Sequence, residues 1–229
     1  MIEGSDIISL DCNSSVYDAI FFMKRRNIRR VVITCERNPL GLFTVDEALK
    51  QILYSTETKL KDIKLKDIIR VNSKDIREIV NAMILNNVDA VIIDNKIITE
   101  KDVVLSVNWG NDKISKISKD AITIESYSSM VTAIEIMLKH NIRHLPVLEK
   151  EPRGMLSARD IVYYYCDNLT LDSPVSQLMT PNLVNADNNL TLRDGVNLMK
   201  KYGIGSLFIR PKKIVTFKDF IVYIFNENQ

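Results

Sequence analysis

Three segments of the chain place a hydroxyl side chain three residues before an aspartate, with a basic residue directly in front of that aspartate. The residues are Thr99, Lys101 and Asp102; Ser157, Arg159 and Asp160; and Thr216, Lys218 and Asp219. A hydroxyl, a cation and the free N–H groups of a helix N-terminus together form a site for a phosphate group. A nearby carboxylate can accept hydrogen bonds from the cis-diol of a ribose. The three segments therefore suggest nucleotide binding.

The same spacing also has a structural interpretation. Ser or Thr followed three residues later by an acid is the capping box that starts a helix, and an apolar run follows each segment. Two details favour a ligand. A capping box prefers Glu or Gln as its acid, whereas these segments use the shorter Asp, and each has a base before it. Both interpretations stay open at this point.

A fourth segment departs from the pattern. It has Thr44 and Glu47 in the hydroxyl and acid positions, and Asp46 where the other segments have a base. Two adjacent acids beside a phosphate would weaken binding. We expect Thr44 and Glu47 to act only as a helix cap.

The four segments belong to a repeat of the whole chain, with a period of about 55–60 residues. A Met followed four residues later by Asn or Gly, and then by Ile or Val, occurs at Met23, Met83, Met137 and Met199. Asn and Gly tolerate the left-handed conformation that ends a helix, so each signature predicts a helix end. Good N-caps stand eight residues before each Met, at Ser15, Asp75, Ser129 and Thr191. A helix is predicted between each cap and stop.

Two short apolar runs follow each helix end and predict buried strands. They are residues 31–33 and 41–43, 91–93 and 96–98, 145–147 and 154–156, and 207–209 and 213–215. A strand is also expected before each first helix, most clearly at 121–124, and a second helix after each acid. The predicted unit is strand, helix, strand, strand, helix, and the fold class is α/β (α+β).

Odd and even copies alternate in character. Copies one and three have the longer hairpin, a Gly before its second strand and basic residues at the start of its first strand. These residues are Gly41, Arg29 and Arg30, and Gly154, Arg143 and His144. A doubled pair of copies best explains the alternation. The predicted modules are 6–107 (copies at about 6–56 and 60–107) and 114–227 (copies at about 114–167 and 172–227), joined by the polar linker 108–113.

These residues resemble a known family. The segments Asn141–Val147, Gly154–Asp160 and Val175–Pro181 are similar to those of CBS domains, named after cystathionine β-synthase, and the resemblance covers residues 6–227. It implies two pseudo-twofold modules, each with clefts for adenosyl ligands between its copies, and modules that associate further. Because it leaves no room for a catalytic domain, we expect a regulatory sensor and no enzyme.

The resemblance also implies roles for single residues. Asp102, Asp160 and Asp219 would bind the ribose, and Thr123 and Asn185, on the strands before the first helices, would meet the adenine. Arg143 and His144 would lie near the same cleft, although His144 could equally be an ordinary strand residue. We expect the second module to bind better, because Asp89 stands in copy two where the odd copies have Arg. The expected ligand is AMP, ADP or ATP, with S-adenosylmethionine as a further possibility.

Composition limits the alternatives. The chain of 229 residues carries a net charge of +2, and no apolar run approaches the roughly 20 residues that span a bilayer. Three scattered cysteines fit a reducing, cytoplasmic setting. The spacing of His140 and His144 resembles a zinc pair, but Asn141 breaks the helix between them, so no metal is expected.

Two other functions remain open. The first is a ligand-free interaction protein. The second is nucleic-acid binding through residues 24–26 and 29–30, a basic cluster that also suits a solvated helix end. The sequence does not distinguish a monomer from a homodimer formed by module packing.

Overall fold

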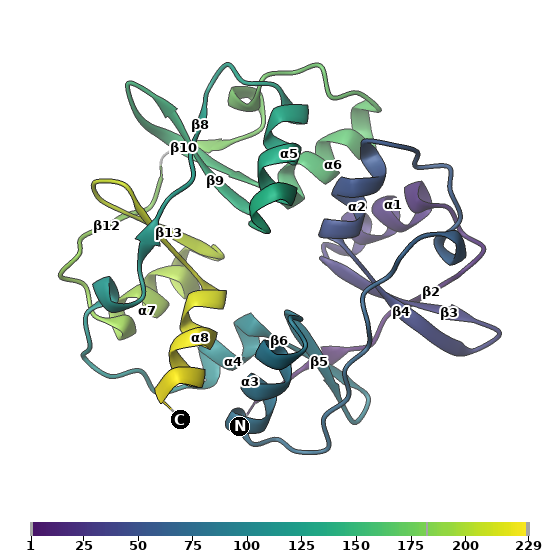
Figure 1. The fold of residues 1–229 in the computed structure, drawn as a ribbon, viewed down its shortest axis with the longest axis horizontal. Helices are drawn as coiled ribbons and strands as arrows, with labels where there is room; N and C mark the ends of the chain where they lie inside the picture. Colours follow the sequence, from purple (N-terminus) through teal and green to yellow (C-terminus); the bar gives the residue numbers. More distant parts are fainter. Residues whose placement is uncertain (1, 182, 228–229) are drawn as a thin grey trace. The chain divides into compact units, whose positions relative to one another are not determined.

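Four copies of one unit, strand–helix–strand–strand–helix, follow each other along the chain (Figure 1). The structure, a computed structural model, describes residues 2–181 and 183–227. Copy one contains β2 (Ser9–Asp11), α1 (Val16–Arg26), β3 (Arg30–Cys35), β4 (Asn38–Thr44) and α2 (Val45–Ile52). Copy two contains α3 (Ile76–Leu85), β5 (Ala90–Ile93), β6 (Lys96–Thr99) and α4 (Glu100–Ser106), and a parallel bridge between Arg70 and Ile92 replaces its first strand.

The second half of the chain repeats this order. Copy three contains β8 (Ile124–Glu125), α5 (Met130–His140), β9 (His144–Glu149), β10 (Glu151–Ser157) and α6 (Ala158–Asn168). Copy four contains β12 (Asn185–Ala186), α7 (Leu192–Tyr202), β13 (Ser206–Ile209), β14 (Lys213–Thr216) and α8 (Phe217–Glu227). The predicted fold class is confirmed, and so is the predicted order of elements, except that an isolated bridge takes the place of the first strand in copy two.

Short elements connect the copies. They are β1 (Ser5–Asp6), β7 (Lys119–Asp120), β11 (Thr180–Pro181), and the one-turn helices η1 (Leu60–Asp62), η2 (Ile114–Lys116) and η3 (Val175–Gln177). The lead-in strand of one copy pairs with the sheet of its neighbour along the chain: β1 pairs with β6, β7 with β14 and β11 with β10.

The predicted helix starts and stops are in place. The first helices of the copies begin after their predicted caps, Ser15, Asp75, Ser129 and Thr191. The left-handed residues at their ends are Asn27, Asn87, Asn141 and Gly203. The repeat signature therefore works as predicted, because it marks where a helix must turn into a strand.

The glycines that only copies one and three carry allow a second chain segment to approach the hairpin. A Cβ at Gly41 would lie 2.8 Å from the carbonyl oxygen of Lys66, and one at Gly154 would lie 2.5 Å from that of Thr180. Lys66 can therefore pair with Leu42 beside the hairpin, where both backbone hydrogen bonds between them form. The close approach also brings the side chain of Lys66 to the first turn of α2.

Packing divides the chain into two compact units. We name Ile8–Ile68 with Ile122–Leu183 the odd unit, because it holds copies one and three, and Met1–Ile7 with Ile69–Ala121 and Val184–Gln229 the even unit. In the odd unit α2 packs against α5 and α6, and α1 against α6 (Figure 1). In the even unit α8 packs against α3 and α4. Each unit has its own apolar core.

These units group the four copies differently from the predicted modules. The sequence placed copies one and two in residues 6–107, whereas the helix packing joins odd with odd and even with even. The copies that share hairpin length and charge are thus the copies that pack together in one unit. Residues 108–113 are also more than a polar connection: Trp109 is buried in the core of the even unit, edge-on to Phe220, and its indole N–H donates to the carbonyl of Val104. The modules 6–107 and 114–227 stay a prediction.

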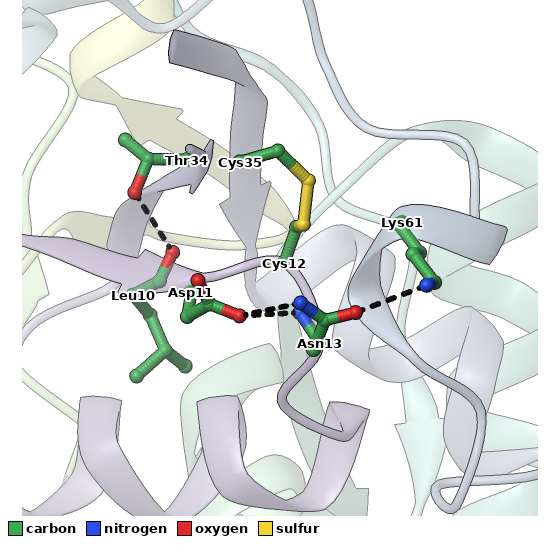
Figure 2. The surroundings of a disulfide bond; sticks show 7 residues. All are labelled: Leu10, Asp11, Cys12, Asn13, Thr34, Cys35 and Lys61. Carbon is green, nitrogen blue, oxygen red and sulfur yellow. Dashed lines mark hydrogen bonds between the residues drawn. A yellow bond between two sulfur atoms is a disulfide. The ribbon is translucent and has the colours of Figure 1, made fainter. Parts of the chain in front are cut away.

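A disulfide joins Cys12 and Cys35 in copy one (Figure 2). It links the residue after β2 to the last residue of β3, with the two Cα atoms 5.3 Å apart, and the N–H of Cys12 donates to the carbonyl of Thr34. Spacing alone did not reveal this pair, because 23 residues separate the two cysteines in sequence. In the sequence the three scattered cysteines fit a reducing setting, whereas in the structure two of them form this bond and the free, buried thiol is Cys166.

Candidate ligand-binding site

All four hydroxyl–acid segments cap a helix. In copy three the N–H and the hydroxyl of Ser157 donate to Oδ2 of Asp160 at 2.9 and 2.7 Å, and the N–H of Asp160 donates back to the hydroxyl. The corresponding bonds to the acid form between Thr44 and Glu47, Thr99 and Asp102, and Thr216 and Asp219. The structural interpretation of the motif is therefore correct in every copy. A ligand could bind only to those polar atoms of the motif that are not already hydrogen-bonded in the cap.

The second carboxylate oxygen distinguishes copy four from copies two and three. Oδ1 of Asp219 accepts a hydrogen bond from Nζ of Lys119 at 2.8 Å, and the Asp219 side chain is only 12% exposed. Oδ1 of Asp160 accepts no hydrogen bond from the residues that the structure describes. Copy three thus keeps one oxygen that can accept from a ribose hydroxyl, whereas copy four has engaged both.

The structure brings the predicted residues of copy three together at one end of its sheet. Ser157 lies opposite His144 in the β9–β10 ladder, and the N–H of Ala158 donates to the carbonyl of Arg143 at 2.9 Å. Arg159 and Asp160 follow in the first turn of α6. Thr123 directly precedes β8, which pairs in parallel with β9.

Positive charge gathers around this motif. The pKa of Arg29 is lowered to about 10 by burial and then by the charges of Arg159, Arg30 and Arg143. The pKa of His144 is lowered to about 3, first by burial and then by Arg29, Arg143 and Arg159. His144 is therefore neutral at pH 7. The three arginines make the N-terminal end of α6 a basic site, which we name the arginine cluster (Arg29, Arg143 and Arg159).

A carboxylate of copy one pairs with an arginine of this cluster. Asp46 in the first turn of α2 accepts from Nε of Arg143 at 2.8 Å and from Nη2 at 2.6 Å, and it also pairs with Lys66. Burial would raise the pKa of Asp46, but the hydrogen bonds and charges of Arg143 and Lys66 outweigh it and lower that pKa to about 2. Asp46 is therefore ionised at every physiological pH.

Sequence reasoning missed this contact. It identified Asp46 as the acid that stands where other copies have a base, and treated copy one as a helix cap only. The reversed charge was a signal for an ion pair, but the partner lies 97 residues away. Finding it requires knowing that copies one and three pack together.

Comparison with known proteins identifies the fold family. The family model of the CBS domain matches residues 2–54 and 114–167, which are copies one and three. The chain is a CBS-domain protein. Its four copies form four CBS repeats, of which the family model matches the odd two.

Full-length similarity extends over all four repeats. A solved structure from Methanocaldococcus jannaschii, proposed to be an archaeal homologue of γ-AMPK, has a TM-score of 0.82 and 17% identity, and the match covers 97% of this chain and 98% of that one. A conserved protein from Pyrococcus horikoshii has a TM-score of 0.64 and 15% identity, covering 97% and 96%. At these identities the similarity shows the fold alone.

Curated relatives match at the sequence level. A 33.4 kDa protein in the ribosomal RNA operon of Thermofilum pendens is 21% identical over 90% of this chain and 84% of its own length. Inosine-5'-monophosphate dehydrogenase of Aquifex aeolicus is 30% identical over 44% of this chain. The match spans only 22% of that dehydrogenase, so it concerns a part of the enzyme and carries no activity over to this CBS-domain protein.

The even unit holds the motifs of copies two and four. Lys101 and Lys218 are exposed, and Asp102 and Asp219 cap α4 and α8. Asn185 opens β12 and lines a hollow together with Asp187, Asn188, Asn189 and Arg210. The site roles predicted for copies two, three and four stay predictions.

The remaining predicted features lie away from this site. Lys24 pairs with Asp167, and the guanidinium groups of Arg25 and Arg26 lie over the rings of Phe21 and Phe22. These three cations occupy the last turn of α1, where they favour the helix dipole. His140 ends α5 and His144 begins β9, so the two histidines do not share a helix face. Within the described ranges no helix is long and apolar enough to cross a membrane.

Proposed function

We propose that this CBS-domain protein is a regulatory protein that binds an adenine nucleotide or a related adenosyl ligand at copy three. The observation that carries the proposal is the second oxygen of Asp160. It stays available after the cap has formed, at the start of an 11-residue helix and beside the arginine cluster. The cap holds the carboxylate in one orientation, so the remaining oxygen is positioned to accept from a ribose hydroxyl.

The phosphate end of the ligand would lie over the N-terminus of α6. Free backbone N–H groups and the helix dipole favour an anion there, and Arg159 in the first turn adds a full charge. Arg29 is partly buried and is repelled by the neighbouring arginines, and a bound anion would offset that repulsion. Thr123, next to the same sheet, would contact the adenine through its backbone.

In this role the protein binds the ligand and does not convert it. Side chains at the site hold a ligand in place through hydrogen bonds and charge. A bound ligand then acts on the rest of the protein only through the difference in its affinity for two arrangements of that protein. AMP, ADP, ATP and S-adenosylmethionine share the adenosyl group that Asp160 would recognise.

A second candidate, a ligand-free interaction protein, is favoured by one observation. In copy four the acid of the motif is satisfied within the chain, by its cap and by Lys119. The motif can therefore serve the fold alone. We propose ligand binding at copy three and a structural role for the motif of copy four.

Thermal unfolding and calorimetry with AMP, ADP, ATP and S-adenosylmethionine test the proposal. At least one of them should stabilise the wild-type protein at millimolar concentration, and Asp160→Ala should abolish that stabilisation. Since the substitution also removes a helix cap worth about 1 kcal/mol, Asp18→Ala is the matched control. Asp18 forms the same capping box with Ser15 at the start of α1, in the same unit but outside the site.

Two outcomes would contradict the proposal. If no adenosyl ligand shifts the melting temperature of the wild-type protein, the ligand-free candidate holds. If Asp18→Ala reduces ligand binding as strongly as Asp160→Ala does, the effect comes from helix stability and not from a contact with the ribose.

A further inference from the structure

The position two residues after the capping hydroxyl sets copy one apart from the other three. Lys101, Arg159 and Lys218 occupy it in copies two to four, and Asp46 occupies it in copy one. The local fold is the same, because the N–H of Val45 donates to the carbonyl of Arg29 as that of Ala158 does to Arg143. The reversal of charge is therefore a property of the side chain and not of a changed backbone.

Asp46 uses this position to bind the arginine of the opposite copy. Two parallel hydrogen bonds from Arg143 reach its two oxygens, and Lys66 adds a third contact. A guanidinium binds a phosphate group with the same bidentate geometry. Arg143 is anchored at the start of α6 through its carbonyl group, so Asp46 holds an arginine that belongs to the proposed phosphate site.

The equivalent pair of residues, with the roles of copies one and three exchanged, consists of two bases and not of an acid and a base. Arg159 stands in copy three where Asp46 stands in copy one, and Arg29 stands in copy one where Arg143 stands in copy three. Instead of an ion pair, Arg159 and Arg29 repel each other; burial lowers the pKa of Arg29, and the charge of Arg159 lowers it further. Among the described residues, neither Arg29 nor Arg159 has a carboxylate within ion-pair distance. Of the three arginines in the cluster, Arg143 is neutralised by Asp46 and the other two are not.

We propose that Asp46 is a resident anion that competes with ligand phosphates for Arg143 and so limits how many negative charges the site at copy three accepts. This inference rests on the proposed function. A single phosphate group can use Arg159, Arg29 and the N-terminus of α6. Additional phosphate groups must approach the Asp46 carboxylate, which repels them and keeps Arg143 occupied.

The Asp46→Asn variant tests the inference, because it removes the charge and keeps the shape. The ratio of ATP affinity to AMP affinity should rise about tenfold relative to wild type, which calorimetry measures directly. Asp67→Asn is the matched control: it removes one charge from the exposed neighbour of Lys66 and should leave the ratio unchanged. An unchanged ratio in Asp46→Asn would overturn the inference.

A double-mutant cycle separates competition for Arg143 from a general change in charge. In an Arg143→Gln background, Asp46→Asn should raise the ratio less than it does in the wild-type background, because the shared arginine is gone. Should Asp46→Asn fail to fold, the single variants Arg143→Gln and Arg159→Gln still decide. Arg159→Gln should weaken AMP binding more than Arg143→Gln does, and the reverse order would contradict the inference.

Inorganic tripolyphosphate and inorganic phosphate separate this inference from the proposed function. Both probes lack the adenosyl group. If no adenosyl ligand binds the wild-type protein, yet tripolyphosphate stabilises Asp46→Asn more than it stabilises wild type, the proposed function fails and the role of Asp46 stands. If nucleotides bind and tripolyphosphate affects both proteins equally, the role of Asp46 fails alone.

Discussion

Copies one and three share a fold and pack against each other in the odd unit, yet they differ at the positions that face their common interface. Copy one contributes an acid, Asp46, at the start of its second helix, and copy three contributes a base, Arg159. Copy one has a disulfide where copy three has Ser126 and Glu149 at the equivalent positions. Copy one has Arg30 where copy three has His144.

The comparison shows which positions of the repeat are free to vary. Capping residues and buried apolar residues are alike in the two copies, because the backbone depends on them. Charged residues at the helix starts do not set the backbone and can change sign. A duplicated fold can therefore keep its structure while the charge at a helix start differs between its copies.

The largest expected effect concerns the disulfide, which only copy one has. Reduction should lower the free energy of unfolding by about 3 kcal/mol, because a closed loop of this length restricts the unfolded chain. Denaturant unfolding with and without reductant measures the difference. Cys12→Ser should make the protein insensitive to reductant. If three thiols react in the denatured, unreduced protein, the bond does not form and the two copies are more alike than the structure shows.

The next effect concerns His144, whose counterpart in copy one is Arg30. The folded pKa of His144 lies near 3, below its ordinary value of 6.5, because of burial and the charges of Arg29, Arg143 and Arg159. Its contribution to stability is therefore complete above pH 6.5 and is lost as the pH falls toward 3. Between pH 7 and pH 5 the wild-type protein should lose up to about 2 kcal/mol more than His144→Gln.

His140→Gln is the control for this pH dependence, because His140 is exposed at the end of α5. It should keep the wild-type slope of stability against pH. If His144→Gln keeps that slope as well, His144 is not held neutral by burial and the arginine cluster.

The smallest expected effect concerns Arg29, which faces the base Arg159 of copy three and not an acid. Arg29→Gln should stabilise the ligand-free protein by about 1 kcal/mol, because it removes a partly buried charge and the repulsion between that charge and Arg159. The gain should shrink at high salt, as measured by thermal unfolding at two ionic strengths. Arg25→Gln, which removes an exposed charge from α1, should bring no such gain. A destabilising Arg29→Gln would mean that Arg29 is satisfied in the fold.

Much of the fold could be predicted because its signals are local. A capping residue such as Ser129 and a left-handed residue such as Asn141 act within a few residues of themselves. The same holds for the acid motif at Ser157 and Asp160, whose structural role the sequence already suggested. Of the candidate site, sequence reasoning identified the residues of copy three. It could not tell copy three from copy four, because the difference lies in Lys119, 100 residues from Asp219.

The repeat, its helix boundaries and its capping boxes follow from the sequence alone, because neighbours along the chain determine them. Three other features depend on the tertiary structure: the pairing of odd with odd copies, the bond between Cys12 and Cys35, and the contact of Asp46 with Arg143. These features join residues far apart in the chain. A charge or a thiol specifies what it can bind but not where its partner lies, and only the packing of the helices brings the partners together.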